Sequence, residues 1–121
     1  MKSKTVLFIN GLLAAVFLAA GLILQPRFPE QMATHWGSNG QVDGYGSQFV
    51  GIWLLPLMVA GLTLLLIGLP TIDPKRANIE KFRPFYNQFI LFFGIYMLYI
   101  HSLTLAWNLG YVFNFNTYIL T

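Results

Sequence analysis

The side chains best suited to polar chemistry are concentrated in one segment, residues 28–47, between two long apolar runs. It carries one imidazole, His35, two carboxylates, Glu30 and Asp43, and one indole, Trp36. Imidazole and carboxylate groups act as metal ligands and as acid–base groups. Their spacing matches no metal motif, and no Ser-His-Asp arrangement with a plausible geometry is present. We therefore predict that the protein is not an enzyme, and we take Glu30, His35, Trp36 and Asp43 as the candidate site residues of this segment.

A second set of polar side chains recurs every seven residues near the C-terminus: Asn87, His101 and Asn108, with Gly94 between them and Thr104 beside them. Seven residues make nearly two helical turns, so this polar stripe occupies one helix face. On a membrane helix such a face is expected to point at protein. Two interpretations stay open: hydrogen bonding between helices, or a polar site inside the bundle. A stripe of small residues on the first apolar run would permit close helix packing: Gly11, Ala15 and Ala19.

The two histidines, His35 and His101, are weak metal candidates. In a helix that starts near residue 88, His101 lies about 20 Å along a hydrocarbon core of about 30 Å. That position is below the segment that carries His35, so the two imidazoles could converge with Glu30 and Asp43. Because no spacing supports this convergence, we predict no cofactor, and a metal-dependent membrane enzyme is retained only as an alternative.

Three long apolar runs must position these groups. The chain has 121 residues, of which 56% are hydrophobic and 9% charged, whereas soluble domains carry about 25% charged residues. The runs at 6–24, 49–69 and 88–109 have the length of membrane-spanning helices, about 20 residues. We predict one all-α, integral membrane domain with three transmembrane helices, an ordered outer loop at 25–48 and a cytoplasmic loop at 70–87. There is no cysteine, which excludes disulfides.

Positive charges predict the orientation. Lys2 and Lys4 precede the first run, four basic residues lie between the second and third runs, and Arg27 alone lies on the other side. This bias places the N-terminus in the cytoplasm. We predict a multi-pass membrane protein, with the lipid bilayer as a partner. Topology explains the basic residues, so no direct nucleic-acid partner is predicted. The four residues are Lys75, Arg76, Lys81 and Arg83.

Several local patterns are more ordinary. Residues 43–47, Asp-Gly-Tyr-Gly-Ser, are typical of a turn, because glycine permits positive φ and aspartate can bond the nearby backbone. We expect Thr63 and Thr104 to bond back to their own helices. Residues 77–82 predict a short helix ended by Pro84. Residues 110–121 are apolar but too short to span a membrane, so we expect them to lie in its interface.

Two sequence stretches flank the second apolar run. The first reads Pro29…Thr34-His35-Trp36-Gly37…Gly40…Asp43-Gly44-Tyr45-Gly46-Ser47, and the second reads Leu69-Pro70-Thr71-Ile72-Asp73-Pro74-Lys75-Arg76-Ala77-Asn78-Ile79. Together they resemble the N-terminal module of the SdpI-like integral membrane proteins of bacteria. The resemblance implies immunity to, or sensing of, a secreted peptide toxin that attacks the membrane. It also implies signal transduction, in which a cytoplasmic regulator is held at the membrane, and a location in a bacterial or archaeal inner membrane.

On this resemblance, the outer-loop residues named above would face the toxin. The cytoplasmic loop would contact the regulator or anionic lipid through Asp73, Lys75, Arg76 and Asn78. SdpI-like proteins continue with further spans, whereas this sequence stops at Thr121 where a fourth would start, so we expect a short relative or a truncated form. An alternative is a transport or channel subunit, in which the polar stripe lines a path between protomers of a homo-oligomer.

Overall fold

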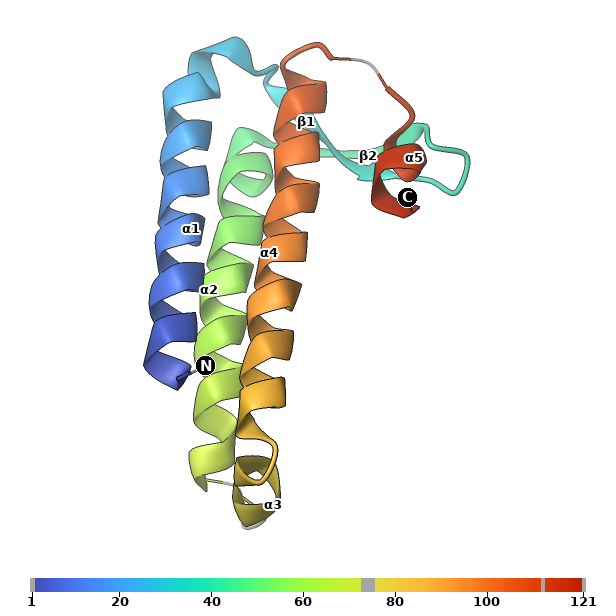
Figure 1. Cartoon of the computed structure of the whole chain (residues 1–121). Helices are drawn as coiled ribbons and strands as arrows, with labels where there is room; N and C mark the ends of the chain where they lie inside the picture. Colours follow the sequence, from blue (N-terminus) through green and yellow to red (C-terminus); the bar gives the residue numbers. More distant parts are fainter. Residues whose placement is uncertain (1, 73–75, 112, 121) are drawn as a thin grey trace.

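The computed structural model describes residues 2–72, 76–111 and 113–120. Its helices α1 (Ser3–Leu24), α2 (Gln48–Ile72) and α4 (Arg83–Asn108) pack side by side as a bundle (Figure 1). The N-terminus and α3 (Arg76–Glu80) lie toward one end, here called the α3 end. At the opposite end, here called the hairpin end, lie η1 (Gln25–Arg27), β1 (Gln31–Trp36), β2 (Val42–Ser47) and α5 (Phe115–Leu120).

Within the described residues, three helices are long and apolar enough to cross a membrane, which confirms the predicted helical runs. Three boundaries differ from the prediction by three residues or more. Helix α1 begins at Ser3 instead of residue 6. Helix α2 continues past Pro70 to Ile72. Helix α4 begins at Arg83, with Pro84 in its first turn, where the missing N–H of proline removes no helical hydrogen bond. Pro84 therefore starts the long helix instead of only ending the short one.

The predicted outer loop contains an antiparallel β-hairpin, so the all-α prediction is wrong for this segment. The strands pair from Gln31 with Ser47 to Trp36 with Val42. The chain reverses at residues 37–40, where the Gly40 N–H donates to the Gly37 carbonyl at 3.0 Å and Gly40 has a φ of 79°. The turn predicted at residues 43–47 is in fact strand β2.

The glycines of β2 have a packing role that the turn interpretation missed. A Cβ at Gly44 would lie 2.9 Å from His35 Cβ, and one at Gly46 would lie 3.4 Å from Thr34 Cγ2. Side chains of β1 thus cover the glycine face of β2, while the alternate residues of β2 are exposed. Glycine is required here by close strand contact, and its presence alone does not distinguish a strand from a turn.

Two apolar clusters hold the bundle together. At the hairpin end, Phe28 and Met32 pack with Ile52 of α2 and Leu105 of α4. Met32 is fully buried, and a Cβ at Gly51 would lie 2.7 Å from its sulfur. Near the α3 end, the second cluster joins all three long helices through Val6, Ile90 and Leu91, with Leu66 and Ile67 against it. The first cluster therefore fixes the hairpin to the helices.

A polar contact joins the long helices between these clusters. Asn10 Nδ2 donates to Thr63 Oγ1 at 3.1 Å and to the Ile90 carbonyl at 3.2 Å. A Cβ at Gly94 would lie 2.5 Å from Asn10 Nδ2. We call these four residues the asparagine crossing. Thr63 therefore accepts a hydrogen bond from another helix, whereas the sequence predicted only a bond back to its own helix.

The predicted packing stripe of small residues on the first helix is wrong in part. Ala15 and Ala19 are exposed, and the buried face of α1 instead contains Val6, Asn10 and Ala14. A buried amide needs hydrogen-bond partners, and α2 and α4 supply them. This requirement turns the Asn10 face inward and leaves the alanine face outside.

Candidate functional site

Asn108, at the end of α4, anchors the hairpin. The Ala33 N–H donates to Asn108 Oδ1 at 2.8 Å, and Asn108 Nδ2 donates to the Ala33 carbonyl at 2.9 Å. The same Nδ2 also donates to the Thr104 carbonyl at 2.8 Å. The side-chain amide thus pairs with both polar groups of Ala33, as a neighbouring strand would. The hairpin is therefore positioned by hydrogen bonds as well as by apolar packing.

Helix α5 connects the turn of the hairpin to α4 (Figure 1). Asn116 Nδ2 donates to the carbonyls of Gly37 and Ser38 at 3.1 and 2.7 Å. On its other side, the Tyr99 hydroxyl of α4 donates to the Tyr118 carbonyl at 2.8 Å. Residues 113–120, expected only to lie in the interface, therefore form a strap between the hairpin and α4.

Trp36 belongs to this packed assembly. Its ring stacks on Phe115, with centroids 3.9 Å apart and planes 10° apart, and meets Trp107 edge to face at 5.8 Å. Trp36 Nε1 is buried and has no hydrogen-bond partner among the described residues. We infer that Trp36 shapes the site by packing against Phe115 and Trp107, although it is among the candidate site residues predicted for the outer loop.

A pocket of about 220 Å³ opens between the hairpin, α2, α4 and α5. We call it the hairpin pocket. A smaller cavity of about 50 Å³ adjoins it and shares Thr34, Leu55 and Thr104 with it. We call this the histidine cavity, because His101 lines it. The remaining lining of the hairpin pocket is His35, Trp36, Ile100, Phe115, Asn116 and Ile119.

His101 is the polar group at the inner side of this site. Its side chain is 1% exposed, and the ring of Phe17 lies edge-on at a centroid distance of 6.3 Å. Its Nε2 atom is buried without a hydrogen-bond partner in the part of the chain that the structure describes. A buried polar atom without a partner is uncommon in folded proteins, and it marks a place where water or a ligand group would be stabilised.

His35 and Asp43, two of the candidate site residues of the outer loop, lie together on the hairpin. His35 Nδ1 and Asp43 Oδ1 form a hydrogen-bonded pair across the hairpin. The pair is open to solvent, with 72% of the His35 side chain and 52% of the Asp43 side chain exposed. Such surface pairs contribute about 0–1 kcal/mol to stability. Glu30 is also exposed, but it precedes β1 and does not line the hairpin pocket.

The weak metal candidates are not assembled into a ligand set. Over residues 2–72, 76–111 and 113–120, no group of three or more His, Cys, Asp and Glu side chains is placed to hold a metal ion. His35 lines the hairpin pocket, whereas His101 lines the histidine cavity. The metal hypothesis therefore gains no support from the geometry.

The rest of the polar stripe also faces its own chain. Asn87 is buried near the α3 end, where its Nδ2 donates to Ser3 Oγ at 3.2 Å. Thr104 is buried, and its hydroxyl donates to the Ile100 carbonyl at 3.2 Å, as expected for a bond back to the helix. Asn87 and Asn108 thus bond other segments of the chain, as the hydrogen-bonding interpretation predicted, and His101 and Thr104 line a cavity.

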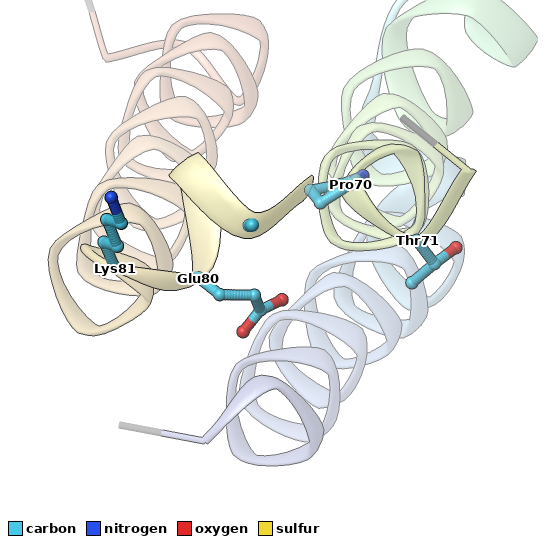
Figure 2. Close-up of a pocket in the computed structure, with 5 residues that line it drawn as sticks. Pro70, Thr71, Glu80 and Lys81 are labelled. Atoms are coloured by element: carbon cyan, nitrogen blue, oxygen red, sulfur yellow. The ribbon is translucent and has the colours of Figure 1, made fainter. Parts of the chain in front are cut away.

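A larger, open pocket of about 610 Å³ lies at the α3 end (Figure 2). Its described lining is Pro70, Thr71, Ala77, Glu80 and Lys81. Nearby, Arg83 Nη2 contacts Glu80 Oε1 at 2.6 Å. Of the residues predicted to contact a regulator, Asp73 and Lys75 lie outside the described residues, as does the side chain of Arg76, and Asn78 is exposed. We assign no ligand to this pocket.

The family model described as a domain of unknown function (DUF1648) matches residues 12–60. No curated protein and no solved structure matches the chain. The matched segment runs from the middle of α1 through the hairpin into α2, so it includes His35, Asp43 and Leu55. It does not include α4, which supplies His101 and Asn108.

The sequence missed Asn10, Asn116 and the strap. Asn10 is one polar residue in an otherwise apolar run, and that contrast was the available signal, because an amide in such a run must find partners. Asn116 gave no comparable signal, because its two acceptors are backbone carbonyls nearly 80 residues away in the chain.

Proposed function

We propose that this chain is an SdpI-like membrane protein that binds a membrane-active peptide at its hairpin end without catalysing a reaction. Binding there would protect the cell from the peptide or report its presence. The match to DUF1648 supports this proposal, because that family occurs in SdpI-like proteins and the matched residues include the whole hairpin. The observation that carries the proposal is the hairpin pocket, a recess beneath a hydrogen-bonded hairpin at the end of three apolar helices.

We further propose that the hairpin end faces outward. Among the described side chains, Lys2, Lys4, Lys81 and Arg83 belong to the α3 end, while Arg27 belongs to the hairpin end. Cytoplasmic loops are enriched in lysine and arginine. This orientation would expose the hairpin pocket to a peptide that arrives from outside the cell.

The physical chemistry of membrane-active peptides suits such a site. An amphipathic peptide lies in the membrane interface with its apolar side chains turned toward the acyl chains. The hairpin pocket offers apolar walls from Leu55, Ile100 and Ile119 for one such side chain. The exposed His35 and Asp43 pair at the hairpin surface supplies polar groups for the peptide backbone or a charged side chain.

The transport alternative receives less support from the same contacts. Asn87 bonds Ser3 of α1 and Asn108 bonds Ala33 of β1, so these side chains are engaged within one chain. A path between protomers would have to break these bonds or be lined by other residues. We therefore favour binding over transport.

The test is a protection assay with a variant that fills the pocket. Sensitive cells would express the unsubstituted chain or Leu55→Phe and be exposed to a membrane-active, bacteriocin-like peptide, with membrane insertion verified for both. We expect Leu55→Phe to lower the highest peptide concentration that the cells survive about tenfold, the equivalent of ~1.4 kcal/mol of binding free energy. His35→Ala and Asp43→Asn should have smaller effects, because that pair is exposed.

The matched control is Leu65→Phe, which makes the same change on α2 at a leucine that is 52% exposed and lies outside the hairpin pocket. It should protect as well as the unsubstituted chain. If the unsubstituted chain protects and Leu55→Phe protects equally, the pocket has no part in the activity. If the unsubstituted, inserted chain gives no protection against any peptide tested, the immunity proposal is wrong for this chain.

A further inference from the structure

We propose that the hairpin pocket and the histidine cavity are two parts of one site, which takes a phenol-like group: a flat apolar ring that ends in a hydroxyl. In the peptide of the proposed function, this group is the side chain of a tyrosine. The identification of the source as a peptide depends on the proposed function, whereas the preference for a hydroxyl-ended ring depends only on the residues that line the two spaces.

The first observation is the size and lining of the hairpin pocket. Pockets for whole drug-sized ligands have volumes of about 300–1,000 Å³, and the hairpin pocket has about 220 Å³. It therefore suits one ring or one side chain better than a complete lipid. Trp36 and Phe115 contribute aromatic walls, and Leu55, Ile100 and Ile119 contribute aliphatic ones, which together favour a flat apolar group.

The second observation is independent of the first and concerns His101. The His101 side chain is only 1% exposed, and it lines the histidine cavity. Its Nε2 atom has no partner among the described residues. Leaving such an atom unsatisfied is unfavourable. A purely apolar ligand would leave Nε2 without a hydrogen bond, whereas a ligand with one hydrogen-bonding group would supply that bond.

The histidine cavity has room for a group of this size. Its volume is about 50 Å³, and one water molecule occupies about 30 Å³ in the liquid. Thr34 and Thr104 also line it. The Thr104 hydroxyl donates to the Ile100 carbonyl, so its oxygen keeps a lone pair that can accept a hydrogen bond. A phenolic hydroxyl can both donate and accept, and it therefore matches a site formed by an imidazole nitrogen and a threonine oxygen.

The connection between the two spaces determines the order of the groups in the ligand. Thr34, Leu55 and Thr104 line both, so they mark the place where the hairpin pocket meets the histidine cavity. A ring in the larger space would extend its hydroxyl past these residues toward His101. An acyl chain has no polar group at its end to reach the imidazole, which is why we favour the phenol over a lipid tail.

Ring resonances of the two histidines allow a direct test. The chain contains only His35 and His101, so one variant, His35→Asn, is enough to assign the His101 signals in the unsubstituted chain, labelled with nitrogen-15 in the histidine rings. The full chain in lipid nanodiscs would be titrated with p-cresol and, in parallel, with toluene, which lacks only the hydroxyl. Empty nanodiscs would correct for partitioning of both probes into lipid.

We expect p-cresol to shift the His101 Nε2 resonance saturably, with an affinity about tenfold higher than that of toluene, as one additional hydrogen bond in a buried site predicts. Thr104→Val should reduce this preference several-fold, because it removes the hydroxyl oxygen that would accept a hydrogen bond from the phenol. Equal affinities with no Nε2 shift would disprove the hydroxyl-binding end, and saturable binding of neither probe would disprove the site. Cross-relaxation between His101 and lipid acyl protons in the unliganded chain would assign the site to lipid instead.

These outcomes are separate from those of the proposed function. The titration uses no peptide, so p-cresol binding by a chain that gives no protection would contradict the proposed function and retain the site. The converse outcome is also distinct. If Leu55→Phe loses protection but the chain binds p-cresol and toluene equally well, the peptide site is supported and the phenol preference is contradicted.

Discussion

Two buried asparagines, Asn10 and Asn108, hold two regions of the bundle in different ways. At the asparagine crossing, Asn10 bonds a side chain of α2 and a carbonyl inside α4, so helix is joined to helix. At the hairpin end, Asn108 bonds both backbone groups of Ala33, so a helix is joined to a segment that is not helical. The first contact brings regular elements together, and the second positions an irregular one.

The difference lies in the space that each contact leaves. At the crossing, Gly94 brings α4 so close that a Cβ would overlap the Asn10 amide. At the hairpin end, the anchored hairpin and the strap leave the hairpin pocket and the histidine cavity beside them. The crossing is thus closely packed between α1 and α4, and the space of about 250 Å³ beside Thr63 is otherwise lined by Leu7, Gly11, Ala60 and Leu64, so it offers one polar side chain. The hairpin end instead combines an ordered hairpin with space that several polar side chains line, as a binding site requires.

The largest effect is expected at the crossing, from Gly94→Leu. A Cβ there would lie 2.5 Å from Asn10 Nδ2 and 2.9 Å from Asn10 Cγ, so the larger side chain must push α1 away from α4. We expect a loss of about 3 kcal/mol in the free energy of unfolding, at the upper end of overpacking effects. Unfolding by sodium dodecyl sulfate in mixed micelles, followed by circular dichroism, measures it.

The control is Gly61→Leu, which makes the same substitution inside α2, where nothing lies within 4 Å of the position that a Cβ would take. It should leave the stability unchanged or raise it slightly, since leucine has the higher helix propensity. Equal losses in both variants would mean that the crossing is not closely packed, and the contrast between the two regions would fail.

The sequence was sufficient for the helices and for the inward direction of the polar stripe, because both follow from periodicity. Apolar runs of spanning length predicted α1, α2 and α4, and seven-residue spacing placed Asn87, His101 and Asn108 on one buried face. These features depend on residues that are close in the chain, so local patterns encode them.

The hairpin, the strap and the pocket could not be predicted in this way, because long-range contacts determine them. Strand β2 contains two glycines that are typical of turns, and only the cover provided by His35 and Thr34 explains them. Asn116 bonds carbonyls of residues 37 and 38. The histidine cavity needs Thr34, Gly51 and His101 from three separate elements. None of these pairings has a signature in a single sequence.

The next largest effect is expected from Asn108→Leu. Leucine is nearly isosteric with asparagine, but it lacks the Oδ1 and Nδ2 atoms that bond the N–H and the carbonyl of Ala33. The buried N–H and carbonyl of Ala33 would lose their hydrogen bonds, at a cost of about 1–3 kcal/mol. Because the loss is confined to the hairpin, hydrogen exchange in nanodiscs should become at least about tenfold faster over residues 31–36 and stay unchanged over the middle of α1.

Asn10→Leu is the matched comparison, with the same change at the crossing. The Ile90 carbonyl lies within α4, which supplies its own N–H, and the Thr63 hydroxyl can bond back to α2. We expect this variant to cost less than Asn108→Leu and to leave the exchange of residues 31–36 unchanged. Faster hairpin exchange in Asn10→Leu would show that the two regions are coupled rather than independent.

The smallest effect is expected from Asn116→Ala, which tests whether the strap belongs to the site or only to the fold. The variant loses two partly exposed hydrogen bonds to the turn at Gly37 and Ser38, at a cost of about 1 kcal/mol. Stacking of Phe115 on Trp36 and the bond from Tyr99 should hold α5 in place. Exchange should therefore rise only in residues 37–40.

Asn116→Ala should also weaken p-cresol binding a few-fold, because Asn116 lines the hairpin pocket, while the loss of stability stays confined to the turn of the hairpin. Asn78→Ala, an exposed asparagine at the α3 end, should change neither quantity. Faster exchange over all of residues 31–36 in Asn116→Ala would instead make the strap a second anchor equal to Asn108. The order of the hairpin would then depend on contacts from both α4 and the strap, and the pocket would be a product of the whole hairpin end.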